Sequence, residues 1–309
     1  MIGLRATLTG FAPGTALTLA ALALASLACG DGGPEMADPM GPTDPLAIVG
    51  DTIYAVDLDG WLLAFGTESA GTVSRSEPIE GLPPSRRIVG LDYRPSDGRL
   101  YGVGNDSRVY ILDPQAATAT PVSDEPFSPA VNVEADIHFG MGFDPVADKI
   151  MLVSAESGLS WTIDPDDGTA VLNGTVRYAA GDPNSGSTPR ISGLSFVPQG
   201  AASSMVARSA TLRQCANVAY ALDADLEVVI GLCSRESTEF ETLFELNITI
   251  LRCGEVTFDS RGNLIAVSLS EGENRLGFVD PETGDVSWFA SVPAESPIQA
   301  IAVPPGSSA

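Results

Sequence analysis

Hydrophobic and polar residues alternate along the chain in short runs, and polar turns separate pairs of these runs. The stretch Ile53–Phe65 aligns without a gap with Leu100–Leu112, which lies 47 residues further on. Each stretch is an alternating strand, a polar turn and a second alternating strand, which is the pattern of a β-hairpin. Further hairpins, of which the second is less regular, are predicted at Ile150–Ile163, Val218–Leu232 and Leu264–Val279.

A further predicted strand precedes most of these hairpins. These leading strands lie at Val89–Pro95, Phe139–Pro145, Ile191–Pro198 and Gly254–Ser260. Turns such as the Asp-Pro-Glu-Thr-Gly sequence at residues 280–284 follow the hairpins, and a last short strand follows each turn. The repeating unit is therefore four antiparallel strands at a period of about 50 residues, which is typical of a β-propeller blade.

The two ends of the repeat region predict a closed ring. No strand precedes the first hairpin, whereas the C-terminal region offers a spare strand at Ile298–Val303. This strand would complete the first blade and remove the exposed sheet edges. We therefore predict an all-β fold, a single β-propeller over residues 46–305 with five four-stranded blades. Six blades are the alternative because Leu243–Leu251 is an unassigned strand-like run, and an open β-solenoid is a weaker one.

The N-terminal segment has the pattern of an export signal. An apolar run at residues 16–28 is too short for a comfortable membrane span and ends in small residues before Cys29. The string SLACG at residues 26–30 resembles the lipobox of bacterial lipoproteins, in which a peptidase cuts before a lipidated cysteine. We predict a signal peptide at residues 1–28, lipidation of Cys29 and a flexible tether at 29–45. The alternative is an ordinary secretory signal, and both readings place the protein in the cell envelope, membrane-anchored or exported.

The charge of the chain narrows the class of partner. Forty acidic side chains against 16 basic ones give a formal charge of −24, which repels a phosphate backbone and argues against a nucleic-acid partner. We expect a monomer that meets the membrane only through its lipid anchor and binds an unknown protein or small molecule.

Candidate chemistry is sparse. His138 is the one histidine, so multi-histidine metal sites are excluded, and its apolar neighbours favour a structural role. No nucleophile elbow, phosphate loop or Cys-x-x-Cys pair is present. Acidic turns at Asp57–Gly60, Asp164–Gly168 and Asp223–Asp225 offer oxygen atoms to calcium but lack the twelve-residue calcium-loop pattern. We therefore predict that these carboxylates accept hydrogen bonds from the backbone of their own turns and that the protein has no cofactor. Calcium binding is the alternative.

Several motifs between Val89 and Pro198 carry a family resemblance. They are GLDYRPSDGRLYGV, SRVYILDP, PFSPAVN, FGMGFDPVADKI and YAAGDPNSG. They resemble the bacterial domain of unknown function numbered 4394, which implies a propeller-like β domain outside the cytoplasm and no established activity. The chain departs from the family's FGFDFNP sequence, because Gly142 replaces an acid and Asp144 an amide.

The longest loop, Thr175–Arg190, belongs to the part of the chain that carries this resemblance. It is polar, rich in Gly and Pro, and contains Tyr178, Asp182 and Asn184. Binding residues often lie on loops held by a rigid scaffold, so we predict a binding site at these three residues. A plain connection between blades is the alternative.

The strands that face the predicted channel would carry Asp92, Gly142, Ser195 and Thr257. This set is not an obvious metal cage, so the sequence favours a binding or interaction module without catalytic or metal-binding residues. The first alternative is a metal-dependent hydrolase of the lactonase-like propeller type, and the second is a purely structural surface protein.

Three cysteines remain once Cys29 is lipidated, and an oxidising compartment permits one disulfide among them. If Leu222 pairs with about Glu227 in the fourth hairpin, Cys215 lies opposite Ser234. A one-residue bulge would then align the sulfur atoms of residues 215 and 233. We favour Cys215–Cys233, with Cys233–Cys253 and no disulfide as the alternatives.

Overall fold

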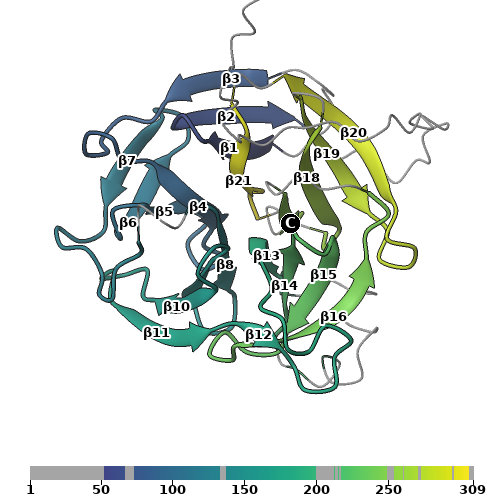
Figure 1. The fold of residues 1–309 in the computed structure, drawn as a ribbon. Coiled ribbons are helices and arrows are strands. Elements are labelled where there is room, and N and C mark those ends of the chain that lie inside the picture. Colours follow the sequence, from purple (N-terminus) through teal and green to yellow (C-terminus); the bar gives the residue numbers. More distant parts are fainter. Residues whose placement is uncertain are drawn as a thin grey trace, which may run out of the picture.

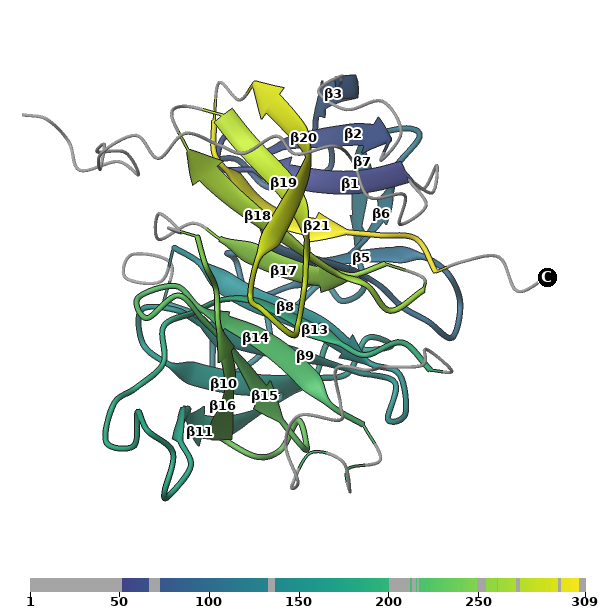
Figure 2. The same cartoon turned by 90° about the vertical axis from the view of Figure 1, so that its right-hand side faces the viewer.

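The protein is an all-β ring. The computed structural model describes residues 52–66, 73–132, 137–199, 212, 215, 217–248, 254–259, 261–270, 273–293 and 296–305. The predicted signal peptide, the lipidation site, the tether and Cys253 lie outside these residues. Five sheets surround one axis (Figures 1 and 2). The described residues contain no helix that is long and apolar enough to span a membrane.

Each sheet is one blade, with its strands arranged in order from the axis to the rim (Figure 1). The first blade contains β21 (Ile298–Ala302), β1 (Thr52–Asp57), β2 (Trp61–Gly66) and β3 (Val73–Pro78). The second contains β4 (Ile88–Tyr93), β5 (Leu100–Gly104), β6 (Val109–Asp113) and β7 (Thr118–Pro121). The third contains β8 (Phe139–Asp144), β9 (Lys149–Ser154), β10 (Leu159–Ile163) and β11 (Ala170–Thr175).

The last two blades follow the same plan. The fourth contains β13 (Ile191–Phe196), β14 (Ala219–Asp223), β15 (Val228–Leu232) and β16 (Glu239–Glu245), with the short β12 (Arg177–Tyr178) added parallel to β16. The fifth contains β17 (Glu255–Phe258), β18 (Leu264–Ser270), β19 (Glu273–Val279) and β20 (Val286–Pro293). Five blades are thus confirmed. The six-blade alternative is wrong, because Leu243 belongs to the outer strand β16 of the fourth blade.

The C-terminal strand closes the ring as the sequence predicts. Strand β21 pairs antiparallel with β1, placing Tyr54 opposite Ala302 and Ala55 opposite Ile301. The C-terminal part of the chain therefore supplies the inner strand of the first blade. This blade joins the two ends of the repeat region and closes the ring.

The hydrophobic core lies in layers between neighbouring blades. One layer joins Phe65 and Ile301 of the first blade to Ile265 of the fifth, and all three side chains are buried. The inner strands approach each other closely at Gly193, where a Cβ atom would lie 2.5 Å from the backbone nitrogen of Val256. Glycine at this position is required by that close approach.

Cys215 and Cys233 form a disulfide with their Cα atoms 5.4 Å apart, which is the pairing that the sequence favours. The register used to argue for it is wrong by two residues, because Leu222 lies opposite Val229. The turn contains Glu227 in the left-handed region, with φ 57°, and it lies between the paired residues Asp223 and Val228, one residue later than the sequence argument placed it. The disulfide therefore ties the segment before β14 to the residue after β15.

We expect the double variant Cys215→Ser, Cys233→Ser to lose stability. The bond closes a loop with a sequence separation of 18 residues, for which the chain-entropy treatment gives about 3 kcal/mol. Urea unfolding measures the loss, and the wild-type protein in reductant should match the double variant. Equal urea midpoints for the oxidised wild type and the variant would contradict the prediction.

Candidate functional site

A pocket lies on the propeller axis at the end of the ring where the inner strands finish, which we call the trailing end. Its volume is about 300 Å³, and all five blades contribute to it. The residues that line it are Asp92, Tyr93, Pro95, Phe143, Pro145, Ser195, Phe196, Pro198, Gln199, Phe258, Asp259, Val303, Pro304 and Pro305. We refer to it as the axial pocket.

The repeat explains the apolar walls of the axial pocket. Four successive blades carry an aromatic residue near the end of the inner strand, opposite the first or second residue of the neighbouring strand: Tyr93, Phe143, Phe196 and Phe258. Since equivalent positions of a propeller meet around its axis, these aromatic side chains gather in one place. Prolines follow two residues later in three of these blades, as the leading-strand motifs of the sequence show.

Asp92 is the main polar group of the axial pocket. Its equivalents in the next three blades are Gly142, Ser195 and Thr257, one residue before the aromatic position. Its carboxylate accepts hydrogen bonds from Tyr93 N at 2.7 Å and from Phe143 N at 2.8 Å, so it joins the second and third blades. Burial raises the pKa of Asp92 to about 7, although these two backbone donors lower it.

A further carboxyl group, that of Glu255 at the start of the inner strand β17, interacts electrostatically with Asp92. It is 4 % exposed and accepts a hydrogen bond from Val256 N at 3.2 Å. Its Oε1 also lies over the Cα position of Gly193, where a Cβ atom would be 2.8 Å away. Burial raises the pKa of Glu255 well above its ordinary value, and the charge of Asp92 raises it further. Sequence reasoning missed Glu255, although its place at the start of a leading strand was visible.

The axial pocket combines acid with apolar surface. Asp92 and Asp259 line it, whereas no lysine, arginine or histidine does. Such a site favours a ligand that has an apolar body and a positively charged or donor-rich group. The described residues contain no group of three or more His, Cys, Asp or Glu placed to hold a metal ion.

The predicted loop residues have partners within the fold. Tyr178 is buried, and its hydroxyl donates to Asp223 Oδ2 at 2.5 Å. Asp182 accepts from Thr242 N at 2.6 Å and from Thr242 Oγ1 at 2.9 Å, and Asn184 Nδ2 donates to Thr242 Oγ1 at 3.0 Å. These contacts pin the loop to β16, and a binding role for the three residues stays a prediction.

The acidic turns use their carboxylates as turn residues do. Asp57 Oδ1 accepts from Asp59 N and Trp61 N, and Asp223 Oδ1 accepts from Asp225 N. Asp164 accepts from Asp166 N and pairs with Lys149 at 2.7 Å. These oxygen atoms therefore have hydrogen-bond donors in the protein itself.

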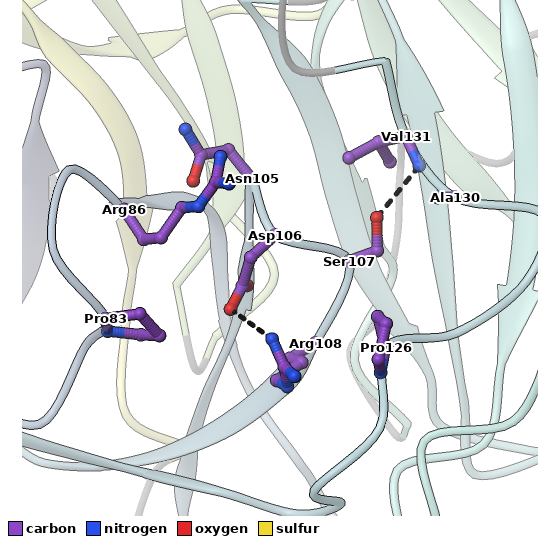
Figure 3. Close-up of a pocket in the computed structure, with 9 residues that line it drawn as sticks. All are labelled: Pro83, Arg86, Asn105, Asp106, Ser107, Arg108, Pro126, Ala130 and Val131. Carbon is purple, nitrogen blue, oxygen red and sulfur yellow. Dashed lines mark hydrogen bonds and ion pairs between the residues drawn. The ribbon is translucent and has the colours of Figure 1, made fainter.

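A second hollow lies at the opposite end of the second blade (Figure 3). Its volume is about 430 Å³, and it lies between the segment before β4 and the β5–β6 turn. Arg86, Asn105, Asp106 and Arg108 line it, and Arg108 pairs with Asp106 at 3.0 Å. This hollow has basic residues in its wall, in contrast to the axial pocket.

The fold and the axial pocket define the class of protein, a five-bladed β-propeller with a pocket on its axis. Within that class the chain belongs to the family described as domain of unknown function DUF4394, whose model matches residues 61–302. The family resemblance noted in the sequence is thus confirmed. A search of curated proteins gave no match.

Two solved structures are similar to the chain at low sequence identity. The chain is similar to a protein in the crystal structure of a nidogen/laminin complex, with 11% identity and a TM-score of 0.49, covering 82% of this chain and 98% of that one. It is also similar to a protein of unknown function from Bacteroides caccae, with 13% identity and a TM-score of 0.45, covering 81% and 85% of the two chains.

Proposed function

We propose that this protein is an exported, lipid-anchored binding module that holds a small amine-bearing ligand in its axial pocket. The observation that supports the proposal is the lining of that pocket, which contains two carboxylates, Asp92 and Asp259, and no basic residue. A pocket of about 300 Å³ admits a small molecule rather than a folded partner.

Asp92 is the group that we expect to meet the amine. Each of its oxygen atoms accepts one backbone hydrogen bond, so each retains a lone pair for a ligand. An ammonium group beside Asp92 would offset the cost of its burial, and Phe143 and Phe196 would cover the apolar part of the ligand. Because the cation favours the ionised carboxylate, we expect binding to strengthen as the pH rises through about 7, the pKa of Asp92.

Calorimetric titration with benzylamine tests this proposal, with benzyl alcohol as the uncharged probe of similar shape. We expect saturable binding of the amine and at least tenfold weaker binding of the alcohol, about what a charged hydrogen bond contributes. The variant Asp92→Asn should lose about tenfold or more in amine affinity. Asp59→Asn is the matched control, because it removes the same charge at an exposed turn of the first blade.

Two results would overturn the proposal. One is the absence of saturation with benzylamine at any pH between 6 and 9. The other is an equal loss of affinity in Asp92→Asn and Asp59→Asn, which would mean that only the net charge of −24 attracts the amine.

Export and anchoring are a separate part of the proposal. The disulfide between Cys215 and Cys233 supports an oxidising compartment, and the lipobox-like sequence supports an anchor at Cys29. We expect metabolic palmitate labelling of the wild-type protein and none of Cys29→Ser, which should appear in the soluble or uncleaved fraction. Labelling that persists in Cys29→Ser would contradict the anchor.

The lactonase-like alternative has no observation in its favour. It requires glutamate, asparagine and aspartate side chains around a metal on the channel strands, whereas three of the four predicted channel positions are Gly142, Ser195 and Thr257. We therefore do not propose it.

A further inference from the structure

The hollow of Figure 3 has a rigid wall on the side of Arg86. This wall is a tight turn before β4, in which Arg86 N donates to Pro83 O at 3.1 Å. Pro84 and Ser85 form the centre of the turn, and Ser85 has a φ of 63°, as the third residue of a type II turn requires. Because proline restricts the backbone here, the backbone of Arg86 does not have to be ordered when a ligand binds.

The opposite wall of the hollow is apolar and is attached to Ser107 in the β5–β6 turn. Ser107 O accepts from Phe127 N at 2.7 Å, and Ser107 Oγ accepts from Val131 N at 3.0 Å. Phe127 and Val131 are both buried in the layer of core that joins the second and third blades. Pro126, Ala130 and Val131 therefore line the hollow from a fixed segment (Figure 3). Such a wall, in a cavity of about 430 Å³, suits the apolar part of a small molecule.

Asn105 contributes an unused hydrogen-bond donor to the hollow. It is 5 % exposed, and its Oδ1 accepts from Arg87 N at 3.2 Å while its backbone nitrogen donates to Arg87 O at 3.0 Å. These two bonds fix the amide group. Its Nδ2 has no hydrogen-bond partner among the residues that the structure describes, and it is not sealed inside the protein. A donor on a side chain that is so far removed from water favours a ligand that accepts its hydrogen bonds.

The two arginines that line the hollow differ in how their guanidinium groups are used. Arg108 Nη1 pairs with Asp106 at 3.0 Å, and Arg108 Nε and Nη2 donate to Asp124 O at 3.2 Å and 2.9 Å. The side chain of Arg86 is exposed and makes no hydrogen bond or ion pair with any residue that the structure describes. The guanidinium of Arg86 is therefore available to a ligand, next in the chain to the residue that holds Asn105.

The acidic groups around Arg108 limit the charge of that ligand. Asp106 Oδ2 accepts from Arg108 Nη1 at 3.0 Å and from Tyr110 OH at 2.7 Å, and Glu125 also interacts electrostatically with Arg108. Acids of the protein thus compensate Arg108, whereas Arg86 lacks such a partner among the described residues. A ligand group with one negative charge matches Arg86, and a doubly charged phosphate is disfavoured by the neighbouring carboxylates.

We infer that the hollow of Figure 3 is a second binding site, which takes a small molecule with one carboxylate group and an apolar body. Arg86 and Asn105 Nδ2 donate hydrogen bonds to the carboxylate, for which a planar guanidinium is the best suited donor among side chains. Pro126, Ala130 and Val131 cover the apolar body. The site differs from the axial pocket in its position, in the sign of its available charge and in its ligand class, so it does not depend on the amine proposal.

Calorimetric titration of the whole protein with benzoate tests this inference. Benzamide is the uncharged probe of the same shape, and acetate and inorganic phosphate are anions without an apolar body. We expect saturable binding of benzoate and at least tenfold weaker binding of the other three, about what one charged hydrogen bond or one buried ring contributes. The formal charge of −24 repels anions in general, so saturation reports a site and not attraction to the whole surface.

Two variants assign the binding to the hollow. Arg86→Gln should weaken benzoate binding by about tenfold or more. Arg261→Gln is the matched control, because it removes the same charge from an exposed turn of the fifth blade. Asn105→Asp keeps the acceptor for Arg87 N but replaces Nδ2 by an oxygen atom that repels the carboxylate, so we expect a similar loss. If its melting temperature shows that Asn105→Asp does not fold, the exposed Arg86 decides the test.

Three results would overturn the inference. They are the absence of saturation with benzoate, equal losses in Arg86→Gln and Arg261→Gln, and binding of inorganic phosphate as tight as that of benzoate. The variant Asp92→Asn separates this site from the axial pocket, because we expect it to bind benzoate as the wild type does. A loss of benzoate binding in Asp92→Asn that equals the loss in Arg86→Gln would place the anion elsewhere and contradict the assignment.

Discussion

Deleting residues 298–309 is expected to unfold the propeller. The deletion removes β21 and with it the buried side chains of Ile298, Ile301 and Val303. Burial of one such side chain contributes about 1.5–3 kcal/mol, so the three together contribute about 5 kcal/mol or more, which is comparable with the whole stability of a typical domain. The deletion also exposes the edge of β1 and one side of the β4 face. We therefore expect aggregation as well as loss of the folded state.

A truncation after Pro305 is the control for this deletion, because it leaves β21 whole. The milder variant Ile301→Ala keeps the strand and should cost about 2–5 kcal/mol in the free energy of unfolding, as expected for a buried Ile-to-Ala change. Circular dichroism and urea unfolding measure both effects. A deletion protein with the urea midpoint of the wild type would show that the ring does not depend on its closing strand.

The architecture was predictable from the sequence because each blade repeats the same local chemistry. A hairpin such as Ile53–Phe65 carries its alternation and its turn residues within a dozen positions, and the copies reinforce one another. The spare strand at Ile298–Val303 then had one place to go, since closure removes the free edges of the first blade.

The register of the fourth hairpin was not predictable in the same way. Its turn uses Glu227 in the left-handed region, whereas four-residue turns of the third and fifth blades use Gly168 and Gly284 at that place. Without a glycine to mark that position, the sequence argument placed this four-residue turn one residue too early, which put Cys215 opposite the wrong residue. The disulfide forms nevertheless, because Cys215 lies outside the strand ladder and is not bound by its register.

The contacts at the two ends of the propeller axis could not be predicted from the repeat alone. Asp92 was placed on a channel strand from the sequence, but its contact with Phe143 depends on how two blades meet. At the other end, the hydrogen bond from Gln299 Nε2 to Ile137 O joins the first blade to the segment before the third, which requires the ring itself, and no local pattern predicts it.

Asp92 is expected to make the stability of the protein fall as the pH rises from about 4 to about 7. In the unfolded chain an aspartate has a pKa of about 3.9, whereas burial raises the pKa of Asp92 to about 7 in the folded protein. Between these values the folded state holds a proton that the unfolded state has released, so stability decreases by about 1.4 kcal/mol per pH unit. The total effect is about 4 kcal/mol, and it is complete above the folded pKa, where both states are ionised.

Other acids act in the opposite direction, so the test compares two proteins. Asp97, Asp148 and Glu156 have lowered pKa values, and their contribution is lost as the pH falls. Both effects are present in the wild type, but Asp92→Asn lacks only the titration of residue 92. The difference in unfolding free energy between the two proteins therefore isolates the titration of Asp92, together with its electrostatic interaction with Glu255.

We expect that difference to change sign with pH. Near pH 4 Asp92→Asn should be less stable than the wild type by about 1–3 kcal/mol, because its amide nitrogen replaces an oxygen atom that accepts from Tyr93 N or Phe143 N. Near pH 8 it should be equal to the wild type or more stable, because the wild type then buries a charge that the amide does not carry. Urea unfolding curves of both proteins at half-unit pH steps measure the crossing. A difference that stays constant across this range would mean that Asp92 titrates as an ordinary aspartate, and that the shielding of the axial pocket does not act on it.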